Sequence, residues 1–407
     1  MTAAHKSNAN RPYIFRPASS GTLAEEMRAI GVSSDGIRLM VPKGLGLAIK
    51  IPDLSAPRAM ILKEQMLSLG GDAAQSRDVL TDSNSRTHVL LLGSETQFGR
   101  LVESLKRQQF GLPALGKQIE RLLNNWSNRP SLFTARDKHL DLTKRTAVMG
   151  ILNVTPDSFS DGGEFLDPKA AVDRALRMQE EGADIIDIGA ESTRPGAAAV
   201  GAKEELERLL PVVSAIVGEL RAILSVDTYK SDVAAAVLDC GADMINDISG
   251  LRFDERMAEV VAKHDAGLAV MHIQGTPRDM QKSPRYDDLI GEIYSCLAWS
   301  CSAAVEAGVN RQSIIADPGI GFGKTLAHNL KLINQLDSFR GLGVPILLGT
   351  SRKSVIGKII KKPVQERLYG TAASVAAAIV RGADIVRVHD VRKMREVCDV
   401  ADAIVRS

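Results

Sequence analysis

Short apolar segments recur eight times between residues 147 and 389, and this repetition restricts the possible folds more than any other feature of the chain. A longer amphipathic stretch follows each segment. The segments are AVMGILN (147–153), DIIDIGA (184–190), AILSVD (222–227), DMINDI (243–248), GLAVMH (267–272), SIIADP (313–318), VPILLGT (344–350) and DIVRVH (384–389). Eight buried strands that alternate with helices over roughly 260 residues have the number and spacing of a (β/α)8 barrel, also called a TIM barrel.

Helices are predicted between these strands and after the last one. They are Pro168 to Glu181, Lys203 to Leu220, Lys230 to Asp239, Asp254 to His264, Asp287 to Ala307, Leu326 to Arg340, Gln365 to Arg381 and Val391 to Val405. The phrases EGAD, CGAD and RGAD each place a glycine just beyond a helix, where a left-handed conformation can end it. An open, doubly wound sheet is the alternative, but no G-x-G-x-x-G sequence follows the first strand to support it.

Residues 1–135 precede the predicted barrel, which spans 136–407, and they are expected to form a small accessory α/β domain and a linker. The patterns that predict this domain are strands at 37–52 and 88–93 and helices at Ala56 to Ser68 and Glu95 to Gln108. It contains no phosphate-binding loop and no assignable cluster of histidines and carboxylates, so a second enzyme is not expected there. Oligomer contacts, control of access to the barrel and small-molecule binding stay open as roles.

Composition limits the partners and the location of the protein. The net charge is +2, but residues 1–140 hold 19 Lys and Arg against 12 Asp and Glu. A solvated basic surface explains this excess better than RNA binding does, so no nucleic-acid partner is expected. No apolar run reaches the roughly 18 residues of a membrane span, and residues 1–16 lack the apolar core of a signal peptide. We therefore expect a cytoplasmic protein with no membrane partner and with four reduced cysteines.

Polar residues stand at or just beyond the ends of nearly all the predicted strands. In barrels of this kind the chemistry lies at the carboxyl ends of the strands, and buried polar groups there need partners. The sequence therefore predicts that one polar site gathers these residues: Asn153, Asp187, Asp227, Asn246, His272, Asp317, Lys353, Arg387 and His389.

The predicted site divides into two chemical sets. Asp227, Asn246 and Asp317 present donors and acceptors that suit the amide and amino edges of a flat heterocycle. Lys353, Arg387 and His389 follow strands 7 and 8, where barrels often bind phosphate, and Asn153 could supply an oxygen ligand to Mg²⁺ on a diphosphate. The Gly-, Pro- and Ser-rich loops at 154–163 and 191–197 are expected to close over a substrate.

Eight motifs then reveal a family resemblance over about residues 145–407. MGILNVTPDSFSDGG, DIGAESTRPGA, SVDT, INDISG, MHIQGTP, ADPGIGFGKT, GTSRKSVIG and RVHDV occur in this order, and the chain resembles the dihydropteroate synthases segment for segment. The resemblance implies a (β/α)8 fold, a homodimer, Mg²⁺ as cofactor and a place in folate biosynthesis, where sulfonamides act. Its substrates would be a pterin diphosphate and 4-aminobenzoate.

The resemblance also implies roles for individual residues. The pterin would be held by Asp187, Asp227, Asn246, Met271, Asp317 and Lys353. The diphosphate would be held by Asn153, Thr193, Arg387 and His389, with Asn153 also as the metal ligand. The 4-aminobenzoate would lie near Thr193, Pro195, Phe322, Lys353 and Ser354. Catalysis would involve Asp157, Thr193, Lys353, Arg387 and His389.

Two rival functions are weighed against this one. A pterin-binding barrel of a corrinoid methyltransferase system would share the pterin pocket but would not need the ESTRPG, SRKS and RVHD segments that are present here. A degenerate barrel kept as a binding scaffold would not need intact polar strand ends. His272 receives no catalytic role, because a strand-end histidine with satisfied hydrogen bonds is an equally good interpretation.

Overall fold

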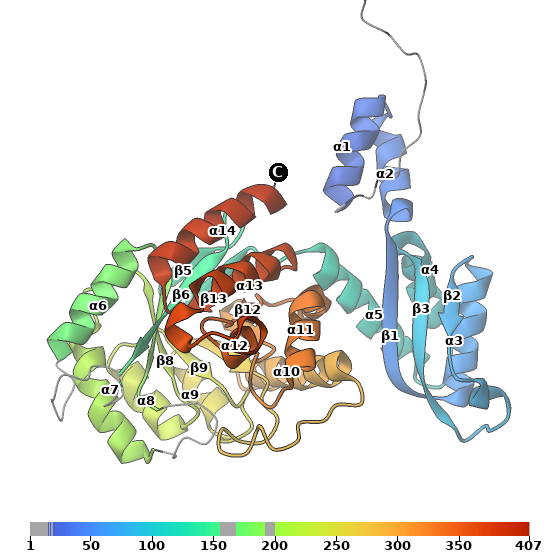
Figure 1. Cartoon of the computed structure of the whole chain (residues 1–407). Helices are drawn as coiled ribbons and strands as arrows, with labels where there is room; N and C mark the ends of the chain where they lie inside the picture. Colours follow the sequence, from blue (N-terminus) through green and yellow to red (C-terminus); the bar gives the residue numbers. More distant parts are fainter. Residues whose placement is uncertain (1–14, 16, 18, 155–167, 192–199, 407) are drawn as a thin grey trace, which may run out of the picture. The chain divides into compact units, whose positions relative to one another are not determined.

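The computed structural model describes residues 15, 17, 19–154, 168–191 and 200–406, and it divides the chain into two compact units, Met1–Leu123 and Asn124–Ser407 (Figure 1). The predicted boundary at residue 135 falls in the turn of a hairpin, β4 (Leu132–Ala135) and β5 (Lys138–Asp141), which belongs to the second unit. Asp157, Thr193 and Pro195 lie outside the described residues. Among the described residues, no helix is long and apolar enough to cross a membrane.

The first unit is a three-stranded antiparallel sheet with strand order β1-β3-β2. Its elements are α1 (Ser20–Ile30), α2 (Ser34–Gly44), β1 (Gly46–Ser55), α3 (Ala56–Ser68), β2 (Asp72–Ala74), β3 (Arg86–Ser94), α4 (Glu95–Leu105) and α5 (Leu112–Ser127), which continues into the second unit. Alternate residues of β1 and β3, such as Ile51 and Leu91, pack with α3, α4 and α5 in one apolar core. The prediction of a small α/β domain is confirmed.

One part of the prediction for this unit was wrong. Residues 37–44 were assigned to a strand, but they lie in α2, which begins where the Ser33 side chain accepts a hydrogen bond from the N–H of Gly36. None of its residues is buried, and the run Ile37 to Val41, interrupted only by Arg38, resembled a short apolar strand in the sequence.

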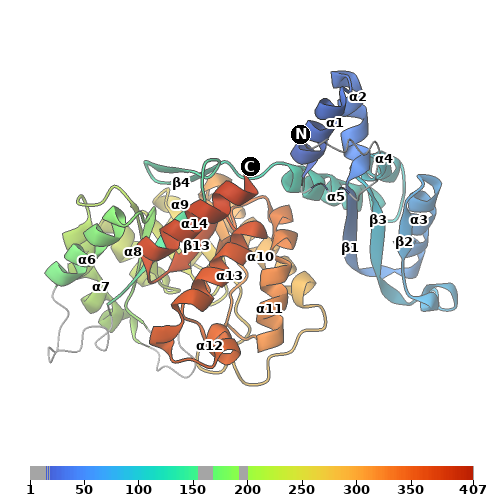
Figure 2. The same cartoon turned by 45° about the horizontal axis from the view of Figure 1, so that its top comes forward.

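The second unit is the predicted barrel of eight parallel strands (Figures 1 and 2). The strands are β6 (Ala147–Asn153), β7 (Ile185–Gly189), β8 (Ile223–Asp227), β9 (Met244–Asp247), β10 (Gly267–Met271), β11 (Ile314–Asp317), β12 (Leu347–Leu348) and β13 (Ile385–Val388). Their order is β11-β10-β9-β8-β7-β6-β13-β12. A bridge between Ala316 and Ile346 joins the two ends, and the N–H of Ala316 donates to the carbonyl of Pro345 at 2.9 Å. The barrel is therefore closed, as predicted.

Helices surround the strands and bury their outer faces in one large core (Figure 2). They are α6 (Pro168–Glu180), α7 (Ala202–Ile216), α8 (Ser231–Asp239), α9 (Met257–Lys263), α10 (Leu289–Glu306), α11 (Leu326–Asn334), α12 (Ser354–Ile360), α13 (Leu368–Val380) and α14 (Val391–Val405). The short helix α12 was not predicted as a separate element. It follows β12 directly and its first residue is Ser354.

A second apolar core fills the amino-terminal end of the barrel. Every strand contributes to it: Ala147 and Met149 come from β6, and the other seven strands supply Ile185, Ile223, Met244, Ala269, Ile315, Leu347 and Ile385. Phe133 and Ala135 of the β4–β5 hairpin belong to the same core, and Phe133 packs against Gly267 at the start of β10. Because this end is plugged, the functional site must lie at the opposite, carboxyl ends of the strands.

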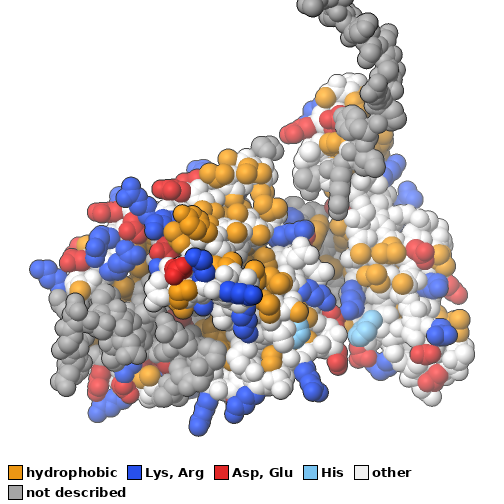
Figure 3. Space-filling view, in the orientation of Figure 1, with side chains coloured by type: hydrophobic (Ala, Val, Ile, Leu, Met, Phe, Trp, Pro, Cys, Tyr) orange, Lys and Arg blue, Asp and Glu red, His pale blue; other side chains and the backbone are white. Residues whose placement is uncertain are grey.

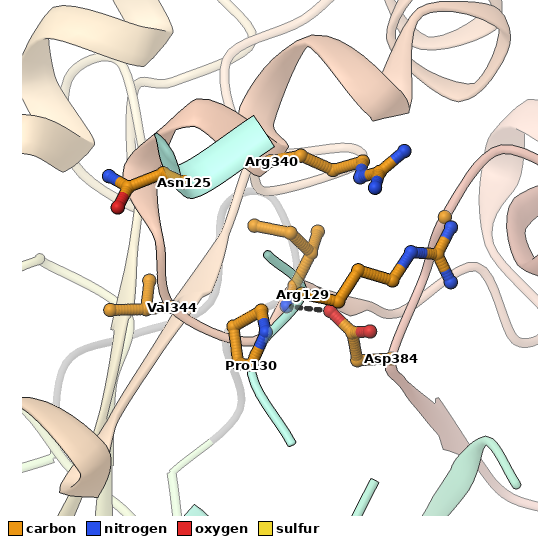
Figure 4. A pocket seen from close by; sticks show the side chains of 8 residues that line it. Asn125, Arg129, Pro130, Arg340, Val344 and Asp384 are labelled. Atoms are coloured by element: carbon orange, nitrogen blue, oxygen red, sulfur yellow. Dashed lines mark hydrogen bonds between the residues drawn. The ribbon is translucent and has the colours of Figure 1, made fainter. Parts of the chain in front are cut away.

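A small cavity also lies at the plugged end, and Figure 4 shows the side chains that line it. The N–H of Ile346 donates to the Asp384 carboxylate at 2.9 Å, just before β12 and β13 begin. The cavity has room for about one water molecule. It therefore belongs to the structural end of the barrel and is too small for a substrate.

Candidate active site

Asp187 on β7 lies at the centre of the polar cluster at the open end of the barrel. Its fully buried carboxylate accepts hydrogen bonds from Ser225 Oγ at 2.7 Å and from Asn246 Nδ2 at 3.0 Å. Arg387 Nε on β13 donates to the same carboxylate at 2.7 Å. These bonds join β7, β8, β9 and β13, so residues far apart in the sequence meet at one point, as predicted.

Arg387 also reaches Asp227, the last residue of β8, at 3.0 Å. Burial raises the pKa of the Asp227 carboxyl to about 7; the Asp187 carboxylate adds to this rise and Arg387 opposes it. Burial would lower the pKa of Arg387, but the two carboxylates outweigh it and raise that pKa above its usual value. Asp227 can therefore change its charge near neutral pH while Arg387 stays a cation.

Lys353, Phe322 and Asp317 form another part of the site. The Lys353 ammonium lies 4.7 Å from the centroid of the Phe322 ring and donates to the carbonyl of Ile320 at 2.5 Å. Burial lowers the pKa of Lys353 to about 8, against the opposing charge of Asp317. Burial also raises the pKa of Asp317, whose carboxylate accepts from the N–H of Gly319 at 2.7 Å. Charged groups and an aromatic face thus stand side by side.

His389 lies just beyond the end of β13, and Asn153 is the last residue of the neighbouring strand β6. His389 Nδ1 lies 3.0 Å from Ser351 Oγ, which also accepts from the His389 N–H at 3.2 Å. Asn153 is exposed at the end of β6, opposite Gly189 in the register. A Cβ on Gly189 would stand 3.8 Å from Asp227 Oδ2 and 3.9 Å from Asn153 Oδ1, so these two oxygens lie on either side of the glycine.

Met271 supplies an apolar surface next to the polar groups. It belongs to a small cluster at the carboxyl end of the barrel with Ile248, Ile273 and Met280, and Phe322 packs against this cluster. An apolar surface beside convergent polar groups suits a flat ring with polar edges. Ser354 begins α12, whose first turn leaves backbone N–H groups without a partner inside the helix.

Sequence reasoning missed several residues that support the site. Ser225 lies within a strand, so it did not stand out by position. A buried ionic cluster next to β7 and β8 was also missed, in which Lys230 contacts Glu191 and Glu205. Lys324 was missed as well, although it stands in the quoted ADPGIGFGKT motif.

His272 is buried at the end of β10. Burial lowers its pKa to about 2, and the nearby Lys324 and Arg252 charges act in the same direction. The ring is therefore neutral over the physiological range. Its Nδ1 lies 3.0 Å from Lys324 Nζ, which fits a histidine with satisfied hydrogen bonds.

Comparison with known proteins places these observations in a family. A family model described as pterin binding enzyme matches residues 149–389. A dihydropteroate synthase from Synechocystis is 51% identical over 267 residues, which cover 65% of this chain and 92% of that protein. A probable bifunctional folylpolyglutamate synthase/dihydropteroate synthase from Halobacterium salinarum is 42% identical over 372 residues, or 91% of this chain and 44% of that protein.

Solved structures agree with these matches. The Yersinia pestis dihydropteroate synthase, solved with a sulfonamide drug complex, has 44% sequence identity and a TM-score of 0.64, covering 68% of this chain and 100% of that one. The Xanthomonas albilineans dihydropteroate synthase, solved with 4-aminobenzoic acid, has 42% identity and a TM-score of 0.63, covering 68% of this chain and 98% of that one. At these identities the likeness extends beyond the fold to the sequence of the barrel.

Proposed function

The chain belongs to the dihydropteroate synthase family of pterin-binding enzymes, and from this premise we propose the reaction that it catalyses. It is a transferase that joins 6-hydroxymethyl-7,8-dihydropterin diphosphate to 4-aminobenzoate and yields 7,8-dihydropteroate and diphosphate in folate biosynthesis. The observation that carries the proposal is the Arg387 guanidinium bonded to both Asp187 and Asp227 at the open end of the barrel. It brings the groups for a pterin and the groups for a diphosphate to one site.

The pterin ring occupies the side lined by Asp227, Asn246 and Asp317. Their carboxylate and carboxamide groups pair with the amino and amide edges of the ring, and Met271 packs against its face. Asp187 supports pterin binding indirectly, because its carboxylate orients both Asn246 and Arg387. Since Asp227 has a pKa of about 7, it can accept from the ring when ionised or share a proton with it.

The diphosphate leaves toward Arg387 and His389, with Thr193 assigned to the same subsite. Positive charge at the leaving oxygens stabilises the charge that develops as the carbon–oxygen bond breaks. The exposed Asn153 oxygen fits Mg²⁺, because this ion takes oxygen ligands, needs few from the protein and keeps several from phosphates and water. Bound there, Mg²⁺ would neutralise part of the diphosphate charge.

The 4-aminobenzoate is placed between Phe322, Lys353 and Ser354, together with Thr193 and Pro195. Its carboxylate faces the unpaired N–H groups at the start of α12, and its ring lies next to Phe322. The neutral amine attacks the pterin methylene carbon: a carbon–nitrogen bond forms, the bond to diphosphate breaks and the nitrogen loses a proton.

The direct test is product formation by the purified chain. Incubation with the pterin diphosphate, 4-aminobenzoate and Mg²⁺ should release diphosphate and dihydropteroate in equal amounts, and omission of Mg²⁺ should remove most of the activity. Arg387→Met should lower kcat/KM by about a hundredfold or more. Methyl transfer from methyltetrahydrofolate without diphosphate release would instead favour the methyltransferase alternative.

We also propose that the protein is a cytoplasmic homodimer. All four cysteines are free, which suits a reducing compartment. Figure 3 shows apolar side chains gathered over α13 and α14, where Tyr369, Val400 and Ile404 are 85%, 63% and 67% exposed. A patch of this kind favours a second copy as its partner. Light scattering should give twice the chain mass, and a Val400→Asp, Ile404→Asp variant should be monomeric.

A further inference from the structure

The loop between β11 and α11 is rich in glycine and packs closely against a neighbouring segment. Residues 318–325 (PGIGFGKT) contain three glycines at positive φ, namely Gly319 at 72°, Gly321 at 86° and Gly323 at 65°. A Cβ on Gly319 would stand 2.0 Å from the carbonyl oxygen of His272, and one on Gly323 would stand 2.6 Å from that of Gln274. The backbone of this glycine loop therefore packs directly against the segment after β10, where a larger residue would not fit.

Side chains fix this glycine loop through its carbonyl groups. Four consecutive carbonyls each accept a hydrogen bond: Ile320 from Lys353 Nζ at 2.5 Å, Gly321 from Gln281 Nε2 at 2.6 Å, Phe322 from Lys324 Nζ at 2.9 Å and Gly323 from Tyr286 Oη at 2.9 Å. Glycines offer no side chain to pack, so these bonds determine the path of the loop.

Lys324 is the buried member of this set, with an exposed fraction of 3%. Its Nζ has three acceptors, which are the Phe322 carbonyl at 2.9 Å, His272 Nδ1 at 3.0 Å and the His272 carbonyl at 3.3 Å. A lysine Nζ carries up to three donors and these three acceptors surround it, while burial lowers the pKa of Lys324 well below its usual value. Lys324 thus ties the glycine loop to the end of β10.

We propose that Lys324 is a positioning residue that fixes the glycine loop and, through Phe322, the aromatic wall that receives 4-aminobenzoate. The inference rests on the proposed function, because that function assigns Phe322 to 4-aminobenzoate. The Phe322 ring lies 4.7 Å from the Lys353 ammonium, so a shift of the loop disturbs both groups. Asp227 and Asn246, on β8 and β9, hold the pterin from outside this loop, whereas Asp317 accepts from the Gly319 N–H within it.

A Lys324→Met variant tests the proposal, because it keeps the length of the side chain and removes its three donors. The KM for 4-aminobenzoate should rise about tenfold, and the KM for the pterin diphosphate should rise clearly less, because Asp227 and Asn246 do not touch this loop. Amide hydrogen exchange at residues 318–325 should also become faster. Lys331→Met, the same change at an exposed lysine of α11, is the control and should leave all three quantities unchanged.

The partner of Lys324 provides a second variant that does not depend on the folding of the first. His272→Leu removes the Nδ1 acceptor but keeps the Phe322 and His272 carbonyls as partners of Lys324, so it should give a smaller rise in the KM for 4-aminobenzoate, whereas His272→Asn keeps an acceptor near that position and should stay close to the parent. The double variant Lys324→Met, His272→Leu should be no worse than Lys324→Met alone, since Lys324→Met already removes the interaction with His272. Equal rises in both KM values, or additive effects, would overturn the proposal.

Hydrogen exchange separates failure of this inference from failure of the proposed function. If the parent protein forms no dihydropteroate, the proposed function is refuted, but exchange at 318–325 in Lys324→Met still reports whether Lys324 holds the loop. If the parent is active and exchange in the variant is unchanged, the anchoring role alone is refuted.

Discussion

At the scale of single residues, Asp187 determines the geometry of the site, because three side chains donate to its carboxylate. Ser225, Asn246 and two nitrogens of Arg387 all point at it, and it is fully buried. In Asp187→Asn an amide NH2 would face these donors, leaving buried groups unpaired at a cost of about 1–3 kcal/mol. We expect kcat/KM to fall by about a hundredfold.

Steady-state kinetics with both substrates check this expectation. Asp173→Asn is a matched control, since Asp173 is exposed on α6. If Asp187→Asn kept the parent kcat/KM, Asp187 would not be the group that orients Arg387 and Asn246.

Two groups of the site whose pKa values are shifted also predict how kcat/KM depends on pH. Asp227, with a pKa of about 7, must lose its proton to accept from the pterin ring, so kcat/KM should rise as pH increases through 7. Lys353, with a pKa of about 8, loses its charge above that pH, so kcat/KM should then fall. The profile of the parent is therefore a narrow bell, which initial rates between pH 5.5 and about 9.5 would reveal.

Two variants test which residue produces the acid limb of this profile and which produces the alkaline limb. Asp227→Asn should have low activity without the acid limb, and Lys353→Arg should lose the alkaline limb, because an arginine stays protonated. An acid limb that persists in Asp227→Asn would mean that another group titrates there.

The sequence predicted those site residues that stand where a strand ends, because such positions are polar in an otherwise apolar run. Asp227, Asn246 and Asp317 were found in this way. Ser225 and Lys324 were not, because their roles depend on hydrogen bonds between strands and loops that only the closed barrel brings together. Sequence spacing carries no information about such distances.

At the scale of elements, the β4–β5 hairpin stabilises the barrel without taking part in its chemistry. Phe133 is fully buried in the core of the plugged end. Phe133→Ala should therefore lower the free energy of unfolding by about 3–5 kcal/mol, measured by urea denaturation, and leave both KM values unchanged. Leu330→Ala, at a position of α11 that is 44% exposed, should cost less than about 1 kcal/mol.

The sequence did not predict this hairpin, since β4 lies in the part of the chain that was assigned to the accessory domain and its linker, before residue 136. The segment is polar and contains Pro130, and only two of its side chains, Phe133 and Ala135, face the core after the strands pair. The barrel strands were easier to predict from the sequence, because both of their faces are buried and they stand out as continuous apolar runs.

At the scale of the whole molecule, the two units differ in what they contribute to the candidate site. All the described site residues lie in the second unit, Asn124–Ser407. The match to the Halobacterium salinarum protein is longer than this unit, so it also includes much of the first. The first unit is therefore a feature that this chain shares with another protein of the family.

Two truncations separate the first unit from the barrel. Deleting residues 1–111 keeps α5 whole, including Asn125, whose Nδ2 donates to the carbonyl of Gly341 at 2.8 Å within the second unit. Because this fragment retains every described site residue, its kcat/KM should stay within about threefold of the parent. A large loss of activity in a folded fragment would show that the first unit contributes to catalysis.

Deleting residues 1–141 should have the opposite outcome, although it removes no site residue. This fragment lacks Phe133 and also Lys138, whose ammonium pairs with Asp243 at 2.8 Å and donates to the carbonyl of Ala222. The amino-terminal end of the barrel would be open, with its apolar core in contact with water. We expect circular dichroism and thermal melting to show an unstable or unfolded barrel, and the contrast between the two fragments places the beginning of the catalytic domain before the hairpin.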